Sequence, residues 1–181
     1  MPPRYPRKQL ARTRAQEELK RANVKNPPVP VEEIARSHNL DIRYEPSKGE
    51  NVSGALYIED GRGIIGVNAD HHPNRQRFTI AHELGHFLLH GRARAAHTVF
   101  LDRKFVWRRD SESELATNPE EIEANQFAAE LLVPLAILHD DVESGEYDLE
   151  NDRHLTRLAK RYGVSLQTLT FRLQILAAFG D

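Results

Sequence analysis

The chain has 181 residues, of which 39% are hydrophobic and 29% are charged, and its formal net charge at pH 7 is −2. This composition suits one globular domain with a buried core, and the slightly acidic balance argues against direct binding of nucleic acid through its phosphates. Cysteine is absent, so any bound metal must be held by histidine and carboxylate groups. Because neither a membrane-spanning apolar run nor a signal peptide is evident, we expect a cytoplasmic protein without membrane contact.

The first half of the chain is expected to place helices before a small set of strands. Residues 7–23 are charged and helix-permissive, and the proline-rich NPPVP at 26–30 must end that helix. A short second helix can begin at Pro30. Three strand-like runs follow, of which the first alternates between apolar and polar residues, and the last two flank Gly61-Arg62, which suits the tight turn of a hairpin. The three predicted strands cover 40–46, 52–60 and 63–70.

The second half is expected to be mainly helical. The pattern predicts one helix over 73–90 and another over 118–133. In the second of these, Asn118 can cap the first turn and Pro134 interrupts the end. The segment 97–107 between the two helices is expected to contain an extended piece.

The C-terminal residues 152–178 predict two more helices on either side of Gly163. Helices that precede and follow a small antiparallel sheet indicate an α+β domain, with the sheet packed against a mostly helical bundle. We expect an N-terminal tail and helix, a core, and a helix-turn-helix-like C-terminal segment packed on that core. The corresponding ranges are 1–29, 30–140 and 141–181.

The stretch HELGH places His82, Glu83 and His86 inside an otherwise apolar helix. Residues four apart share a helix face, so the two imidazoles can converge on one metal ion, while Glu83 can reach a water held there. A chance motif on an amphipathic helix is the alternative. Burying three polar side chains without partners would be costly, however, and a metal removes that cost. Gly85 fits this interpretation because it lets another segment pack closely.

A third protein ligand is needed for a zinc hydrolase site with one open position. The extended metzincin spacing is not present, which leaves the glutamates of the later helix, EIEANQFAAELLVP, as candidates. Glu121 is preferred because Asn125, one turn further on, could orient its carboxylate, and Glu123 is the second choice. Glu120 is better explained by the preference of acidic residues for the start of a helix.

RQRFTIAHELGHFLLHG followed by EIEANQFAAELLVP is similar to the ImmA/IrrE-type zinc metallopeptidases, over about residues 30–140. The resemblance implies three zinc ligands, His82, His86 and Glu121. It also implies that Glu83 is the catalytic base and that Asn125 supports the site, although Mn²⁺ or Fe²⁺ could occupy the same ligands. Members typically cleave a helix-turn-helix repressor encoded nearby. The implied function is therefore an endopeptidase whose protein substrate is a DNA-binding repressor of stress-response or mobile-element genes.

Three questions stay open at this point. His90, one turn beyond His86, either contacts the site or is structural. The C-terminal segment around Gly163 either completes the core as a helical hairpin, which its leucines favour, or contacts DNA or a DNA-binding substrate. In the resembled family this segment is associated with repressor engagement. The alternative function is a non-proteolytic, metal-stabilised regulator, or a toxin–antitoxin-like component, that binds a partner repressor.

Overall fold

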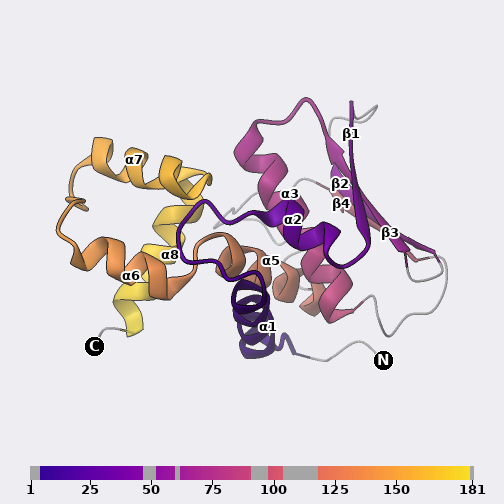
Figure 1. The fold of residues 1–181 in the computed structure, drawn as a ribbon, viewed down its shortest axis with the longest axis horizontal. Helices are drawn as coiled ribbons and strands as arrows, with labels where there is room; N and C mark the ends of the chain where they lie inside the picture. The colour runs from indigo at the N-terminus through magenta and orange to yellow at the C-terminus, as the bar shows by residue number, and fades with distance from the viewer. Residues whose placement is uncertain (1–4, 47–51, 60–61, 91–97, 104–117, 180–181) are drawn as a thin grey trace.

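The computed structural model describes residues 5–46, 52–59, 62–90, 98–103 and 118–179 (Figure 1). None of the helices in these ranges combines the length and the apolar character needed to cross a lipid bilayer. Along the chain, helices precede and follow the strands of one small sheet, which confirms the α+β class. The elements are α1 (Lys8–Arg21), α2 (Val31–Arg36), β1 (Leu40–Glu45), β2 (Val52–Glu59), β3 (Arg62–Asn68), α3 (Pro73–Leu89), β4 (Thr98–Arg103), α5 (Pro119–Leu132), α6 (Leu135–Glu143), α7 (Asp152–Tyr162) and α8 (Leu166–Phe179).

The sheet is mixed, which corrects the expectation of a purely antiparallel one. Its strand order is β1-β3-β2-β4. The predicted hairpin of β2 and β3 is present, and β4 extends it on the other edge of β2, also antiparallel. In contrast, β1 pairs with β3 in parallel, with Leu40 opposite Gly63. Alternation of apolar residues decides which face each side chain takes, but it carries no information about the direction of the neighbouring strand.

The predicted extended piece is confirmed in part. β4 occupies 98–103, whereas 104–107 lie outside the described residues, as does the link from there to α5. α6 is an addition that the sequence pattern did not predict. It begins directly after Pro134, so the proline ends α5 and also stands at the N-cap of the next helix.

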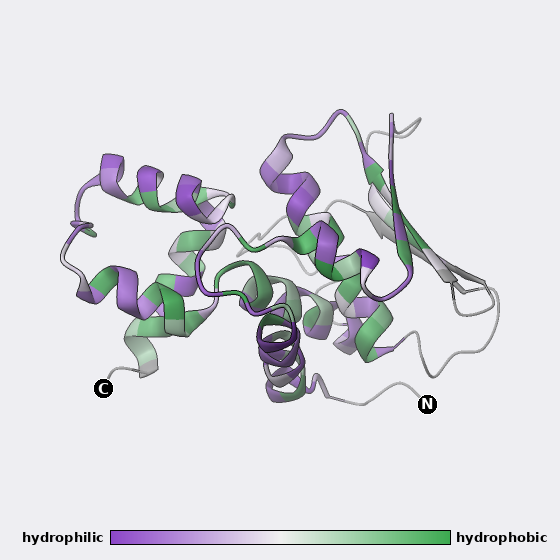
Figure 2. Ribbon diagram, viewed as in Figure 1, coloured by the Kyte–Doolittle hydropathy of each residue, from purple (hydrophilic) through white to green (hydrophobic). Residues whose placement is uncertain are grey.

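The core lies where α3 and α5 pack side by side, with the sheet on one side and α6–α8 on the other (Figure 1). Apolar residues concentrate on the surfaces that these elements turn toward one another (Figure 2). Gly85 makes the close packing of α3 and α5 feasible. A Cβ at this position would stand 3.0 Å from Phe127 Cδ1 and 3.3 Å from the backbone of Ala124. The close approach expected at this glycine is therefore confirmed.

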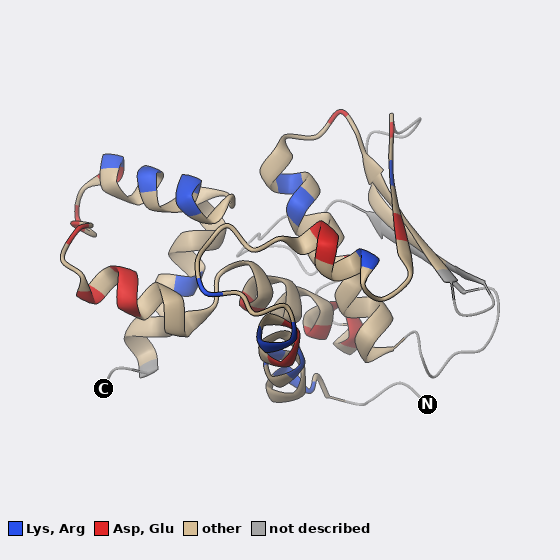
Figure 3. Ribbon diagram, in the orientation of Figure 1, with Lys and Arg blue, Asp and Glu red and all other residues tan. Residues whose placement is uncertain are grey.

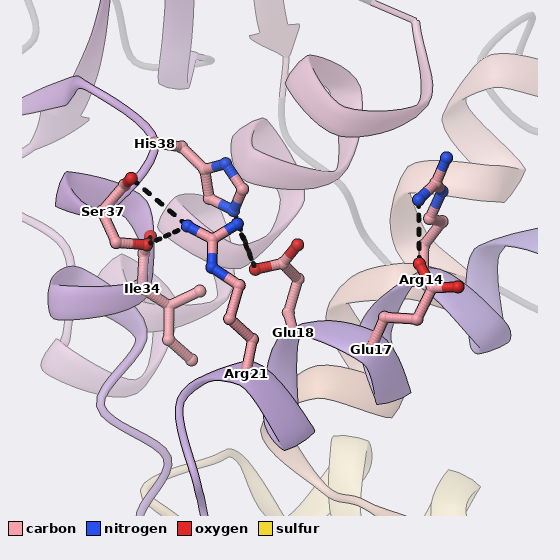
Figure 4. Close-up of polar contacts among 7 residues, drawn as sticks. All are labelled: Arg14, Glu17, Glu18, Arg21, Ile34, Ser37 and His38. Carbon is pink, nitrogen blue, oxygen red and sulfur yellow. Dashed lines mark hydrogen bonds and ion pairs between the residues drawn. The ribbon is translucent and has the colours of Figure 1, made fainter.

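The N-terminal helix α1 is tied to the chain between α2 and β1 by a buried polar pair (Figure 4). His38 Nε2 lies 2.8 Å from Glu18 Oε2, and Arg21 donates to the Ser37 hydroxyl at 3.0 Å. The ring of His38 also meets the edge of Phe87 on α3, with ring centroids 6.3 Å apart. α1 is thus anchored to the segment between α2 and β1, and His38 of that segment contacts the helix that carries the HELGH motif.

The C-terminal helices are packed on α3 and α5. Leu158 and Leu169 are fully buried in the same core cluster as α3, in agreement with the expected helical hairpin. At the turn between α7 and α8, Gly163 has φ 64°, a left-handed conformation that glycine adopts without strain. In the middle of α8, Arg172 donates to Glu130 of α5 at 2.6 Å, with both side chains buried.

Candidate metal centre

Three side chains from two helices converge between α3 and α5. His82 and His86 lie one turn apart on α3 and are buried, and Glu121 comes from the first turn of α5. Glu121 Oε1 is 3.1 Å from His86 Nε2, and its Oε2 is 3.3 Å from His82 Nε2. The two Nε2 atoms are themselves 3.0 Å apart. The structure therefore brings together the histidines of the motif and the glutamate that the sequence favoured.

The spacing of these atoms fits a divalent metal ion. When ligands bind tetrahedrally at about 2.0–2.1 Å, neighbouring ligand atoms are roughly 3.3 Å apart. The two Nε2 atoms are 3.0 Å apart, and Glu121 approaches His86 through Oε1 at 3.1 Å and His82 through Oε2 at 3.3 Å. One ligand atom from each of the three residues lies within 4.8 Å of the others, close enough to share one ion. Two imidazole nitrogens and one carboxylate are also a donor set that zinc accepts, as do manganese and iron. His82, His86 and Glu121 would hold the ion and leave further positions for water or substrate.

Asn125 supports the site through His82. Its Oδ1 lies 3.0 Å from His82 Nδ1, and its side chain is buried. Because an amide oxygen accepts hydrogen bonds, Nδ1 carries the proton and Nε2 presents its lone pair to the site. The sequence argument had placed Asn125 behind Glu121, one turn away on the same helix. In the structure, Asn125 instead forms a hydrogen bond with His82 on α3, because its side chain reaches across the interface between the two helices.

Glu83 is fully buried and lies outside the group of three ligands. It occupies the side of α3 that packs against β2 at Gly54. A Cβ at Gly54 would collide with Thr79 and stand 3.7 Å from Glu83 Oε1, so this glycine lets the helix approach the strand. The position is consistent with a carboxylate that acts beside the metal ligands without being one of them.

The protonation states of the ligands suit metal binding. Burial lowers the pKa of His86, because removing the imidazolium from water outweighs its hydrogen bond to Glu121. Burial alone would raise the pKa of Glu121, but its close contacts with His82 and His86 outweigh burial, so the pKa lies below its ordinary value. Metal ligands must be neutral imidazole and ionised carboxylate, and these shifts favour both forms at neutral pH.

The other glutamates of α5 have different partners. Glu123, the second-choice ligand, is fully buried and accepts hydrogen bonds from Arg7 Nε at 3.0 Å, Arg7 Nη2 at 2.9 Å and the Arg7 backbone at 2.7 Å. It fixes the N-terminal segment to α5 and does not join the ligand group. Glu120 lies at the start of the helix as expected, where its backbone N–H donates to the Asn118 side chain at 3.0 Å.

His90 lies next to the site but does not enter it. Its ring centroid is 5.7 Å from that of His86, and its Nε2 is 3.7 Å from Glu123 Oε2. The side chain therefore connects the ligand His86 with the Arg7–Glu123 pair. The Arg7–Glu123 contact was missed by sequence reasoning, because 116 residues separate the two partners and no local pattern links them.

Residues 35–174 match the peptidase M78 family, described as the IrrE N-terminal-like domain. The chain belongs to this family. The family is named for peptidases, and its typical dependence on metal agrees with the His-His-Glu group of the site. The expected resemblance is confirmed, and the match continues past residue 140 through α7 and most of α8.

A solved structure of a Mycobacterium tuberculosis transcriptional regulator shares the fold of this IrrE N-terminal-like domain. The TM-score is 0.62 with 19% sequence identity, over 91% of this chain and 46% of the regulator. The chain thus spans about half the length of that protein, and at this identity the similarity concerns the fold alone. No curated protein matches the chain.

Proposed function

We propose that the chain is a zinc-dependent endopeptidase that cleaves a helix-turn-helix transcriptional repressor. The main observation in support of a peptidase is that His82, His86 and Glu121 converge within 3.3 Å of one another. Buried Glu83, next to the first ligand in the sequence, supplies the group that hydrolysis needs in addition to a metal.

The residues divide the chemistry among them. A bound zinc ion supplies Lewis-acid chemistry, since it lowers the pKa of a water molecule and polarises a carbonyl group. Glu83 accepts the proton of the attacking water and later donates it to the leaving amine of the cleaved peptide. Asn125 keeps the proton of His82 on Nδ1, which preserves Nε2 as a ligand.

The choice of a repressor as the substrate rests on the resemblance of the HELGH and EIEAN segments to ImmA/IrrE-type peptidases. Cleavage would relieve repression of stress-response or mobile-element genes in the cytoplasm. The fold of a protein called a transcriptional regulator is compatible with such a setting. The substrate would be a protein bound to DNA, with no direct contact between this chain and nucleic acid.

The test combines metal analysis with cleavage. Zinc-loaded protein is incubated with the helix-turn-helix repressors encoded near its gene, and the products are read by mass spectrometry. We expect one defined cut by the wild type and none by Glu83→Gln, which should still retain its metal. Glu17→Gln, an exposed change on α1, is the matched control and should cleave normally. A repressor that is bound but left intact by the metal-loaded wild type would favour the non-proteolytic regulator.

A further inference from the structure

A cavity of about 380 Å³ lies between the first turns of α3 and α8. Arg75 and Phe78 of α3 line one side of it, and Thr168 of α8, with the preceding Ser165, lines the other. Basic residues stand on this N-terminal part of α3 (Figure 3). Neither the ligand group nor Glu83 lines the cavity, so it has no part in the chemistry described above.

Phe78 connects the cavity with the metal centre. It precedes His82 by one helical turn, and the two rings stack with centroids 6.4 Å apart and an interplanar angle of 27°. An extended peptide advances about 3.3 Å per residue. A peptide whose scissile bond lies at the metal ligands can therefore place a side chain one or two residues away in this cavity.

The lining of the cavity suits an anionic group. Arg75 is the only permanently charged residue among the described residues that line it, and none of these carries a carboxylate. Arg75 Nη2 donates to the Ser53 hydroxyl of β2 at 2.6 Å, which holds the guanidinium between strand and cavity. Four of the six other lining residues carry a hydroxyl or amide group: Asn74, Ser165, Gln167 and Thr168. A carboxylate can accept charge-assisted hydrogen bonds from such a surface.

The walls of the cavity are held in place by contacts between α3 and the turn before α8. Asn74 Nδ2 donates to the Val164 carbonyl at 2.8 Å, and Arg77 Nε donates to the Gly163 carbonyl at 3.2 Å. A Cβ at Gly163 would stand 2.9 Å from that Arg77 nitrogen, so the contact requires glycine. A subsite with fixed walls binds with less loss of conformational freedom than a mobile one.

We propose that this cavity is a substrate subsite that accepts an acidic side chain, Asp or Glu, one or two residues from the cleaved bond. The inference rests on the proposed peptidase function and names the substrate chemistry that the site selects. Phe78 packs against the aliphatic part of the bound side chain, and Arg75 binds its carboxylate.

Binding is measured separately from catalysis. Two pools of fluorescein-labelled decapeptides, identical except for a fixed Glu or Gln at the centre, are titrated against zinc-loaded Glu83→Gln protein by fluorescence anisotropy. We expect the Glu pool to bind about tenfold more tightly, because hydrogen bonds to charged groups are the stronger ones. Equal affinity for the two pools, or preference for Gln, would overturn the proposal.

Two variants assign the preference to the cavity. Arg75→Gln should bring the Glu-to-Gln affinity ratio to about one, because the charge that selects the carboxylate is removed. Gln167→Glu is isosteric and leaves α3 unchanged, and it should also abolish the preference by placing a carboxylate in the lining. Arg14→Gln, an exposed change on α1, is the matched control and should keep the wild-type ratio. An unchanged ratio in both cavity variants would contradict the assignment.

Cleavage of the same pools by the wild type separates this inference from the proposed function. Cleavage with no enrichment of acidic residues near the cut would reject the proposed subsite but would still support the proposed peptidase function. Acid-selective binding to Glu83→Gln without any cleavage by the wild type would support the chemistry of the cavity and reject the peptidase.

Discussion

Two carboxylates on α5, half-buried Glu121 and buried Glu130, have different partners. Glu121, in the first turn, meets the imidazoles of His82 and His86. Glu130, in the last turns, meets the guanidinium of Arg172 at 2.6 Å and the amide of Gln16 at 3.2 Å. The Glu130–Arg172 pair balances its charge within the protein, whereas the charge of a carboxylate among neutral imidazoles would be balanced by a bound cation. Burial of a charge is therefore functional or structural according to the chemistry of its partner.

Glu121→Ala should have the largest effect and should affect function alone. Removing one of three ligands should release the metal and lower the cleavage rate by roughly 10³-fold or more, because the lost Lewis acid contributes several kcal/mol. Metal content by mass spectrometry and repressor cleavage measure the change. Glu123→Ala is the counterpart and should keep its metal, since Glu123 pairs with Arg7. If Glu123→Ala loses its metal and Glu121→Ala keeps it, Glu123 is the metal ligand and Glu121 is not.

Arg172→Met should affect stability alone. It leaves Glu130 buried without its guanidinium, which should lower the free energy of unfolding by about 3 kcal/mol, measured by urea denaturation. The double variant Arg172→Met with Glu130→Leu should recover much of that loss, because an apolar pair of similar volume avoids burying an unpaired charge. If the single variant remains as stable as the wild type, the pair of Glu130 and Arg172 does not stabilise the fold.

Asn125→Ala should weaken metal binding without abolishing it. His82 loses the acceptor that holds its Nδ1 proton, and changes at such supporting positions reduce metal affinity by about 10- to 100-fold. Competition with a zinc chelator measures the affinity. Asn118→Ala, which removes the cap of the same helix, is the control for a general effect on α5. Equal losses in both variants would show that Asn125 acts on the helix and not on the histidine.

Gly85→Ala should reduce both the stability of the protein and its binding of metal. The added methyl would press on Phe127 and Ala124, so α3 and α5 must separate slightly. We expect a loss of about 1–3 kcal/mol in the free energy of unfolding, together with weaker zinc binding. Gly145→Ala is the control in open space, although its positive φ adds some strain of its own. Stability and zinc affinity both unchanged in Gly85→Ala would mean that the helix spacing can relax freely.

Tyr44→Phe should have the smallest effect. Burial and the hydrogen bond to Glu32 raise the pKa of Tyr44 to about 12 from 10.0. This contribution to stability is fully present below pH 10 and is lost as pH rises through about 12. Because Tyr44 is 42% exposed, the stability difference between the wild type and Tyr44→Phe should narrow over that window by well under about 1 kcal/mol. Denaturant titrations at pH 9 and pH 12 compare them, and a widening difference would give the opposite sign.

Much of the fold and site could be predicted because the relevant signals are local. The proline and asparagine at the start of α5, the hairpin of β2 and β3, and the α3 helix all follow from residues near one another in the chain. The direction of β1 against β3, the pairing of Asn125 with His82, and the cavity beside Phe78 depend on segments far apart in the sequence. No periodicity or short motif records those contacts.

The spacing of His82 and His86 by itself determined that two imidazoles share one face of a helix, because 3.6 residues make a turn. Which carboxylate faces them was decided only by the tertiary structure. Glu120, Glu121 and Glu123 lie within one turn of α5, and each step along a helix rotates the side chain by about 100°. The rotation of α5 against α3, set by close packing at Gly85, turns Glu121 toward the histidines and Glu123 toward Arg7.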